Sequence, residues 1–160
     1  MKRDYERIRQ RVTADGEHAG RRRAVVDALW EELAAHDVSW VGFYLPDESD
    51  ADALVLDASR DKPACSPIGM HGACGRSFRT HRAVIVRDVR TLGDAYIACD
   101  PRDLSEVVVP CLDDAGTCWG VLDLDSFSVG AFDARDVEGL LAVLRAARLT
   151  SDAPVPIDVC

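Results

Sequence analysis

The sequence predicts an α+β domain in which helices flank a central antiparallel β-sheet. Apolar residues recur at helical spacing near both ends of the chain, whereas its middle contains short β-branched and aromatic runs separated by turn residues. Successive runs joined by short turns pair as antiparallel hairpins. Strands in the middle and helices at the ends indicate a sheet with helices gathered on it, without internal repeats.

Length and composition limit the chain to one hydrophobic core. It has 160 residues, of which 48% are apolar, enough for one ordinary core and too few for two. We therefore expect a single domain over residues 1–150. Within it, the N-terminal helices occupy 1–36, and the sheet, its loops and a C-terminal helix occupy 38–149. Residues 151–160 are expected to form a tail.

Charge and hydropathy exclude two classes of partner. The net charge is −9, which argues against nucleic acid, because phosphate binding depends on neutralisation by Lys and Arg. No apolar run approaches the roughly 18 residues that span a bilayer, and the N-terminus is charged rather than a signal peptide. We expect a cytoplasmic protein that binds neither nucleic acid nor membrane.

The N-terminal segment differs in charge from the rest of the chain. Residues 1–23 hold eight of the nineteen basic residues, including the run 21–23, and four acidic ones. This run reads either as a solvated helix start or as a docking surface for a partner subunit. A homodimer through the N-terminal helices is the hypothesis that follows from the second reading.

Three helices and their buried faces follow from the spacing of apolar residues. The first helix is predicted from Tyr5, Ile8 and Val12. The second, after Gly20, is predicted from Val26, Leu29, Trp30 and Leu33. The last begins near Asp133, a plausible N-cap, and directs four side chains toward the core: Val137, Leu140, Leu141 and Leu144.

The N-terminal half of the sheet is predicted to be a hairpin. Residues 38–45 form a strand, the acidic stretch 47–50 turns the chain, and 53–58 return as the partner strand. Residues 61–70 lack periodicity and are expected to form a loop before a short helix that begins near Gly72.

The C-terminal half of the sheet is predicted to contain three strands. A brief one covers 84–86, and after the irregular segment 90–103 a second hairpin joins 106–112 to 118–125. If 113–116 form a four-residue loop, Cys111 faces Cys118 and Glu106 faces Asp123.

This pairing predicts a cluster of carboxylates. Side chains alternate along a strand, so Glu106, Asp123 and Asp125 share one face of the sheet when the loop has an even number of residues. A three-residue loop would place Glu106 on the other face. The cluster is either an exposed acidic face or the floor of an amino-acid pocket. Like charges at close range would raise the pKa of its members.

Two aromatic residues on the first strand share a face. Trp40 and Tyr44 project to one side of the strand, and Val41 and Phe43 to the other. Trp40 and Tyr44 are either ordinary core residues or the walls of a pocket with a carboxylate floor.

The cysteines indicate thiol chemistry. A chain with a sizeable core and no secretory signal holds its six cysteines in a reducing compartment. The sequence contains no Cys-x-x-Cys pair and no zinc-like arrangement with histidine, so no metal site is expected. Cys65, Cys74 and Cys99 precede the carboxylates and suggest redox chemistry on a small cationic or zwitterionic substrate.

The other three cysteines are read differently. Cys111 and Cys118 are expected to be small packing residues on the face opposite Glu106. Cys160, at the terminus, is expected to take no part in the chemistry.

Several short motifs, in order between about residues 38 and 140, resemble the free methionine-(R)-sulfoxide reductases, a family built from a single GAF domain. They are Trp-Val-Gly-Phe-Tyr-Leu at 40–45, Lys-Pro-Ala-Cys at 62–65, Gly-Ala-Cys-Gly at 72–75, Ile-Ala-Cys-Asp at 97–100, Ser-Glu-Val-Val-Val-Pro at 105–110 and Gly-Val-Leu-Asp-Leu-Asp-Ser at 120–126. The resemblance implies reduction of free methionine (R)-sulfoxide by cysteines, without a bound cofactor, with thioredoxin or a similar dithiol as external reductant.

The resemblance also implies roles for individual residues. Cys99 matches the attacking cysteine, Cys65 the resolving cysteine that forms a disulfide with it, and Cys74 an auxiliary cysteine. Five further residues match the substrate-binding positions: Trp40, Tyr44, Glu106, Asp123 and Asp125.

The chain departs from the family pattern in three segments. The stretch between Cys65 and Cys74 is one residue shorter, Tyr96 replaces the usual histidine, and 57–61 replace a Gly-rich run. These changes are expected to lie in loops that cover the substrate, so another small oxidised amino acid is an alternative substrate. A GAF ligand-binding or sensor module and a structural redox-responsive protein are the alternative functions.

Overall fold

The computed structural model describes residues 2–97 and 99–160, so Ala98 of the Ile-Ala-Cys-Asp motif lies outside the described residues. Its four helices are α1 (Tyr5–Arg9), α2 (His18–Leu33), α3 (Ala73–Thr80) and α4 (Ala134–Ala146). Its strands are β1 (Trp40–Pro46), β2 (Ala53–Arg60), β3 (Ile68–Gly69), β4 (Ala83–Val86), β5 (Ser105–Leu112), β6 (Cys118–Ser126) and β7 (Ile157–Val159). Two short 3₁₀ turns, Val89–Thr91 and Gly93–Ala95, interrupt the segment between β4 and β5.

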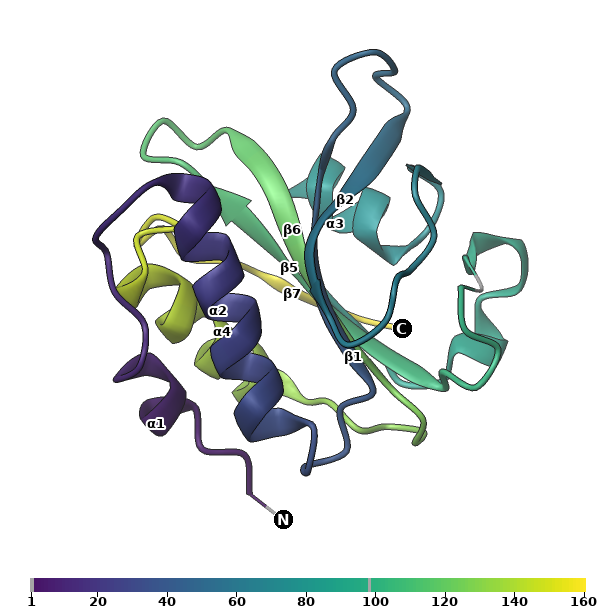
Figure 1. The fold of residues 1–160 in the computed structure, drawn as a ribbon. Coiled ribbons are helices and arrows are strands. Elements are labelled where there is room, and N and C mark those ends of the chain that lie inside the picture. The colour runs from purple at the N-terminus through teal and green to yellow at the C-terminus, as the bar shows by residue number, and fades with distance from the viewer. Residues whose placement is uncertain (1, 98) are drawn as a thin grey trace.

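All seven strands form one curled sheet in the order β3-β2-β1-β6-β5-β4-β7. Helices α1, α2 and α4 cover one face of it, whereas α3 and the long loops cover the other (Figure 1). The α+β class with N-terminal and C-terminal helices around a central sheet is therefore confirmed.

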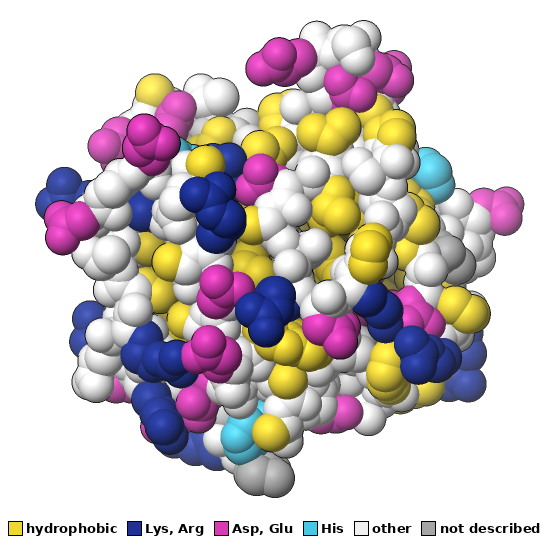
Figure 2. Space-filling model, viewed as in Figure 1, with side chains coloured by type: hydrophobic (Ala, Val, Ile, Leu, Met, Phe, Trp, Pro, Cys, Tyr) yellow, Lys and Arg dark blue, Asp and Glu magenta, His cyan; other side chains and the backbone are white. Residues whose placement is uncertain are grey.

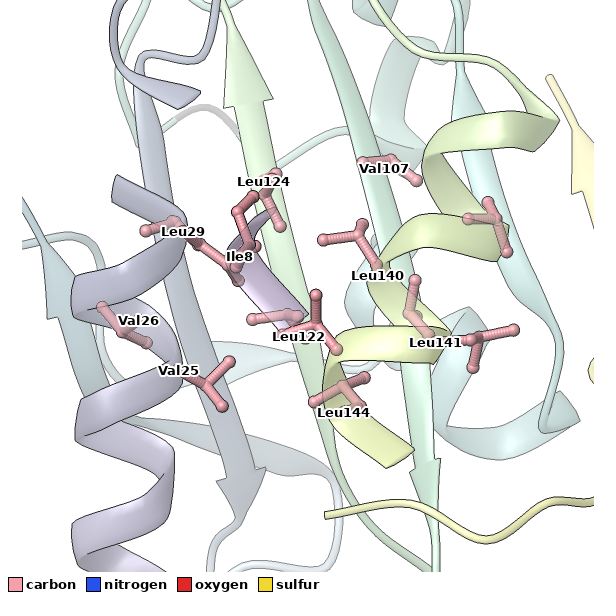
Figure 3. Close-up of a cluster of buried hydrophobic side chains, with 14 of the residues drawn as sticks. Ile8, Val25, Val26, Leu29, Val107, Leu122, Leu124, Leu140, Leu141 and Leu144 are labelled. Carbon is pink, nitrogen blue, oxygen red and sulfur yellow. The ribbon is translucent and has the colours of Figure 1, made fainter. Parts of the chain in front are cut away.

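Alternation along the central strands divides the core into two layers. Val107 and Leu122 point toward α2 and α4, where they join Leu29, Leu140 and other fully buried residues (Figure 3). Val108 belongs to a separate cluster beneath α3. The helical spacing predicted the first layer correctly, because Val137, Leu140, Leu141 and Leu144 are all buried. Asp133 caps α4 as expected.

The β5–β6 hairpin differs in register from the prediction. Leu112 pairs with Cys118, which leaves a five-residue loop, 113–117, and a β-bulge then sets Cys111 opposite Gly120. Glu106 consequently faces Asp125 rather than Asp123, and the predicted pairing of Cys111 with Cys118 is wrong. The odd loop and the one-residue bulge together shift the register by two. The carboxylates therefore still share a face.

The C-terminal segment contributes a strand that the sequence did not predict. Within the expected tail 151–160, β7 pairs with β4 and runs parallel to it, so the sheet is mixed rather than antiparallel throughout. The Cys160 amide donates to the Ile85 carbonyl at 2.8 Å, and the Cys160 Sγ lies 2.9 Å from Nη1 of Arg76. A three-residue strand is too short to show alternation in the sequence.

The three arginines of the basic run 21–23 differ in their contacts. Arg22 forms an ion pair with Asp57 at 2.7 Å, and Arg21 donates to the carbonyls of Ala147 and Arg148 just after α4. Arg23 is exposed. Two of the three arginines thus serve contacts within the chain. Figure 2 shows acidic and basic side chains interspersed on the surface, with acidic ones gathered at the tip of the β1–β2 hairpin.

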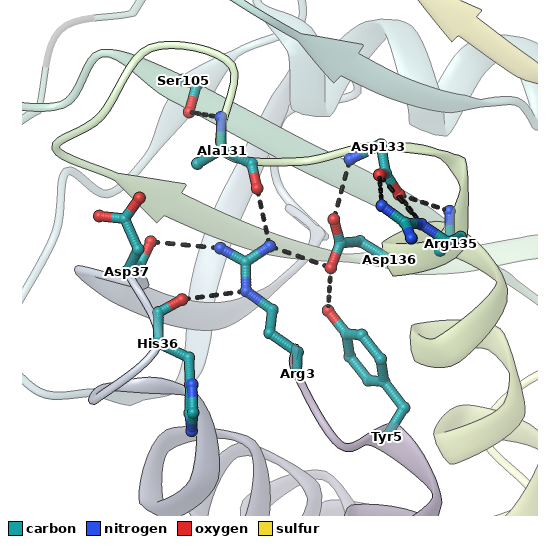
Figure 4. A network of polar contacts seen from close by, with 9 residues as sticks. All are labelled: Arg3, Tyr5, His36, Asp37, Ser105, Ala131, Asp133, Arg135 and Asp136. Carbon is teal, nitrogen blue, oxygen red and sulfur yellow. Dashed lines mark hydrogen bonds and ion pairs between the residues drawn. The ribbon is translucent and has the colours of Figure 1, made fainter. Parts of the chain in front are cut away.

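A polar network joins the N-terminus to α4 (Figure 4). Arg3 Nη1 donates to the Ala131 carbonyl at 2.8 Å and to Asp136 Oδ1 at 3.0 Å, and its Nε donates to the His36 carbonyl. The Tyr5 hydroxyl donates to the same Asp136 oxygen at 2.7 Å. Because Asp136 is buried, both donors compensate for its desolvation.

We expect Tyr5→Phe to lower the free energy of unfolding by about 1 to 2 kcal/mol, because it removes a hydrogen bond to a buried carboxylate and leaves the ring in place. Urea denaturation measures the difference. The matched control is Arg135→Ala, which breaks a solvent-exposed ion pair with Asp133 and should leave stability unchanged. Equal effects in the two variants would contradict a structural role for the network.

Candidate active site

A cavity lies on the face of the sheet opposite α1, α2 and α4. Its volume is about 40 Å³, far below the roughly 300 to 1,000 Å³ of pockets that enclose a small-molecule ligand. The lining residues come from four strands, α3 and the irregular segments that precede β3 and β5: Trp40, Tyr44, Ala64, Ile68, Ala73, Cys74, Tyr96, Ile97, Cys99, Asp103, Glu106, Asp123 and Asp125. Seven of the eight predicted site residues line this cavity, and the eighth, Cys65, is bonded to Cys99.

Trp40 and Tyr44 form one wall and anchor a loop. Both are buried, with ring centroids 6.0 Å apart. Trp40 Nε1 donates to the Lys62 carbonyl and the Tyr44 hydroxyl to the Cys65 carbonyl, each at 2.9 Å. Trp40 and Tyr44 were expected to be either ordinary core residues or the walls of a pocket. They are both, because the buried rings also line the cavity. Gly42 between them has no side chain, since a Cβ there would collide with the Trp40 ring.

The carboxylates of Glu106, Asp123 and Asp125 form the floor. One oxygen from each lies within 4.8 Å of the others, a spacing that suits a small cation or an ammonium group. Glu106 and Asp123 are buried, and Asp125 is half-buried. The cluster is thus an enclosed floor and not an exposed acidic face.

Burial and mutual repulsion favour the protonated form of this cluster. Desolvation, followed by the neighbouring Asp123 charge, raises the pKa of Glu106 and of Asp125 well above the usual range. Desolvation also raises the pKa of Asp123 to about 7, against the opposing effect of a hydrogen bond from Cys74. Asp123 Oδ1 is buried without a hydrogen-bond partner among the described residues. The floor therefore holds protons near neutral pH.

Two further polar residues line the cavity, Asp103 and Tyr96. Asp103 is buried and accepts a hydrogen bond from Ser39 Oγ at 2.9 Å. Burial and the nearby carboxylates raise the pKa of Tyr96. The sequence prediction did not include Asp103, because it lies in a segment without periodicity. Tyr96 was noted only as a departure from the family pattern.

The departure at 57–61 lies away from the cavity. Asp57 pairs with Arg22, and Arg60 pairs with Asp27 at 2.8 Å, so β2 is tied to α2. The expectation that this segment covers the substrate is therefore wrong, because Asp57 and Arg60 turn to the helical side of the sheet and no residue of 57–61 lines the cavity. Tyr96, in contrast, does line the cavity.

Cys65 and Cys99 form a disulfide that joins the two irregular segments. Their Cα atoms are 5.5 Å apart although they are separated by 34 positions in the sequence. Lys62 and Asp100 link the same two segments by an ion pair of 2.5 Å. Cys99 lines the cavity and is exposed, which places it at the mouth, while Cys65 is half-buried.

Cys74 lies inside the cavity in the first turn of α3. Its Sγ is 3.4 Å from Asp123 Oδ2. Burial, reinforced by the charges of Asp123 and Glu106, raises the pKa of the Cys74 thiol well above its usual value. A helix N-terminus stabilises an anion by about 0.3 to 1 kcal/mol at exposed sites, which is small beside the cost of burying a charge. In this arrangement Cys74 is a protonated thiol.

Cys111 and Cys118 lie outside the cavity. Cys111 is fully buried in the helix-side core, and Cys118 Sγ donates to the Gly120 carbonyl at 3.2 Å. Burial raises the pKa of both thiols, to about 11 for Cys118. Both behave as packing residues, in agreement with the expectation from the sequence.

Across the described ranges no helix has the length and hydropathy needed to cross a membrane.

Comparison with known proteins identifies relatives of this chain. The GAF domain family matches residues 23–148. The chain is 37% identical over 107 residues to a free methionine-R-sulfoxide reductase of Saccharomyces cerevisiae, and 38% identical over 114 residues to one of Escherichia coli. These matches cover 66% and 70% of this chain but only 59% and 64% of the two relatives.

A solved structure adds a relative that is covered more fully. The free methionine-R-sulfoxide reductase of Neisseria meningitidis, in complex with its substrate, has 31% sequence identity to this chain and superposes with a TM-score of 0.76. The superposition covers 91% of this chain and 87% of that one. The superposition agrees with the fold described above. The chain belongs to the GAF domain family, and within it to the free methionine-(R)-sulfoxide reductases.

Proposed function

We propose that the protein reduces free L-methionine (R)-S-oxide to L-methionine, with Cys99 as the nucleophile. The observation that carries this proposal is the Cys65–Cys99 disulfide at the mouth of a cavity whose floor is Glu106, Asp123 and Asp125. The cavity combines a redox-active thiol pair with groups that bind an ammonium and hold protons. The preference for the free amino acid and the R epimer is taken from the relatives.

The floor and the wall match the two ends of this substrate. An ammonium group offers three N–H donors, which the carboxylates of Glu106, Asp123 and Asp125 can accept. The aromatic faces of Trp40 and Tyr44 suit the apolar S-methyl group. No Lys, Arg or His occurs among the described residues that line the cavity. A cationic group is therefore the favoured occupant of the floor.

In the first chemical step the Cys99 thiolate attacks the sulfur of the sulfoxide. This attack forms a transient bond between Cys99 Sγ and the substrate sulfur, while a carboxylic acid on the floor protonates the sulfoxide oxygen. The oxygen then migrates to Cys99 Sγ, and the substrate sulfur loses both its bond to oxygen and its transient bond to Cys99. Methionine leaves, reduced by two electrons, and Cys99 becomes a sulfenic acid. The pKa of Asp123, raised to about 7, keeps such an acid available near neutral pH.

In the second step the Cys65 thiol condenses with the sulfenic acid, which forms the disulfide and releases water. A dithiol reductant, thioredoxin or a similar protein, then attacks the disulfide and leaves two thiols while it becomes oxidised. The exposure of Cys99 supports access by an external reductant. Cys74, buried against Asp123, is assigned an auxiliary role. A bound cofactor is not required for these steps.

Loop movement has to precede substrate binding. A cavity of about 40 Å³ is far smaller than the pockets of roughly 300 to 1,000 Å³ that enclose small-molecule ligands. The disulfide and the Lys62–Asp100 pair both join the segments that cover it. Reduction removes the first of these links and allows the segments to part.

This activity is consistent with a cytoplasmic protein that acts under oxidative stress, because methionine sulfoxide is a product of methionine oxidation. A homodimer through the N-terminal helices remains a prediction, and light scattering that found only monomers would contradict it. If the protein bound small molecules without turnover, the alternative would be a GAF sensor module.

We expect Cys99→Ser to abolish turnover of free methionine (R)-sulfoxide, because the hydroxyl is a far weaker nucleophile than a thiolate. Cys65→Ser should still produce one methionine per enzyme and then stop, since Cys99 cannot be reset through a disulfide. NADPH consumption coupled through thioredoxin and its reductase measures turnover. Dimedone labelling and mass spectrometry detect the sulfenic acid on Cys99 in the second variant.

The matched control is Cys160→Ser, which removes a thiol outside the cavity and should turn over like the wild-type protein. The S epimer and an N-acetylated sulfoxide test selectivity and should not be reduced. Full activity in Cys99→Ser, or an absence of turnover with every sulfoxide in folded, reduced wild-type protein, would overturn the proposed function.

The single-turnover rate should fall as pH rises through about 7, the pKa of Asp123. The rate falls because the reaction needs the protonated carboxyl, which is present below this pKa and is lost above it. Rapid quench of Cys65→Ser with substrate measures the rate of methionine formation. A rate that keeps climbing with pH would show instead that Cys99 ionisation limits the step and that no floor acid takes part.

A further inference from the structure

Asp103 is a fourth carboxyl group of the cavity. It ends the segment that carries Cys99, two residues before β5, and its amide donates to the Asp100 carbonyl at 3.1 Å. Only 6% of its surface is exposed, and it lines the same cavity as Glu106 and Asp123. It is absent from the set predicted from the sequence.

Ser39 fixes the position of this carboxyl relative to the floor. The Ser39 hydroxyl donates to Asp103 Oδ1 at 2.9 Å, and its amide donates to the Asp125 carbonyl at 2.8 Å. Asp103 Oδ2 accepts no hydrogen bond from the part of the chain that the structure describes. One oxygen is thus held, and the other is available to a ligand.

The charges around Asp103 differ on its two sides. Toward solvent, Lys62 and Arg102 both pair with Asp100, at 2.5 and 2.8 Å. Toward the cavity, the titratable groups among the described lining residues are acidic or neutral: Cys74, Tyr96, Glu106, Asp123 and Asp125. Burial raises the pKa of Asp103, whereas the hydrogen bond from Ser39 and the charges of Lys62 and Arg102 lower it. In its ionised form Asp103 adds negative charge to the floor.

We propose that Asp103 is a further substrate-binding carboxylate, which selects ligands with a free ammonium group. This inference rests on the proposed function and deepens it. An ammonium has three N–H donors, whereas the cavity has four carboxyl groups. Three carboxyl groups can accept the N–H donors, and the fourth can keep its proton for the sulfoxide oxygen. With only three such groups, one residue would have to serve both ends of the substrate.

Electrostatics supports the same role. The negative charge of Asp103 is one of the causes that raise the pKa of Glu106, Asp123 and Asp125. Removal of this charge should lower the pKa of these three neighbours. It should also weaken the attraction for an ammonium group in a site of low dielectric.

The test is Asp103→Asn, which keeps the shape of the side chain and an oxygen for Ser39. We expect the KM for free methionine (R)-sulfoxide to rise about tenfold, the size of losing one hydrogen bond to a charged group, with a smaller change in kcat. The alkaline limb of the single-turnover rate, measured in the Cys65→Ser background, should move to lower pH. A purely structural role would lower the melting temperature and would not move the pH profile.

The matched control is Asp94→Asn, which removes a charge from an exposed residue in the neighbouring 3₁₀ turn. It should leave both KM and the pH profile unchanged. If Asp103→Asn does not fold, Asp103→Ser is measured by the same criteria. Wild-type turnover combined with an unchanged KM and pH profile in the Asp103 variant would overturn this inference alone. An absence of wild-type turnover would instead overturn the proposed function.

Discussion

The alternation of side chains along β5 and β6 is the constraint on which the rest of the structure depends. Val107 and Leu122 extend into the helix-side core, while Glu106 and Asp123 project to the opposite face. A shift of one residue in either strand would bury the carboxylates under α2 and α4 and expose the core. The odd hairpin loop and the β-bulge are therefore compatible with the fold only together. Each shifts the register by one residue, and a total shift of two leaves every side chain on the same face of the sheet.

The other face of the sheet supports chemistry at a cost in stability. Carboxyl groups buried without a nearby cation favour their neutral forms, and their ionisation destabilises the fold. The protein keeps them enclosed beneath Trp40, Tyr44 and α3. Such an enclosed acidic set is a common feature of sites that hold and transfer protons. The cost is offset by the large apolar layer on the helical side.

Irregular segments cover the cavity, and hydrogen bonds from side chains on or next to β1 hold them in place. The Trp40 indole and the Tyr44 hydroxyl donate hydrogen bonds to backbone carbonyls of the Cys65 segment. Ser39 holds the Cys99 segment by donating a hydrogen bond to Asp103. Rigid strands thus position the loop segments that carry the two cysteines above the carboxylate floor.

The sequence by itself determined the types of most elements, the two faces of the sheet and most of the candidate site residues. Spacing gave the helices from Ile8, Leu29 and Leu140, and strand parity together with family motifs gave the cysteines and the carboxylates. These features are local, or repeat at a short period, so they are visible without a structure. Tertiary structure alone decided the hairpin register, the pairing of β7 with β4, and the place of Asp103 in the cavity. Each of these depends on contacts between segments far apart in the chain, which no local pattern encodes.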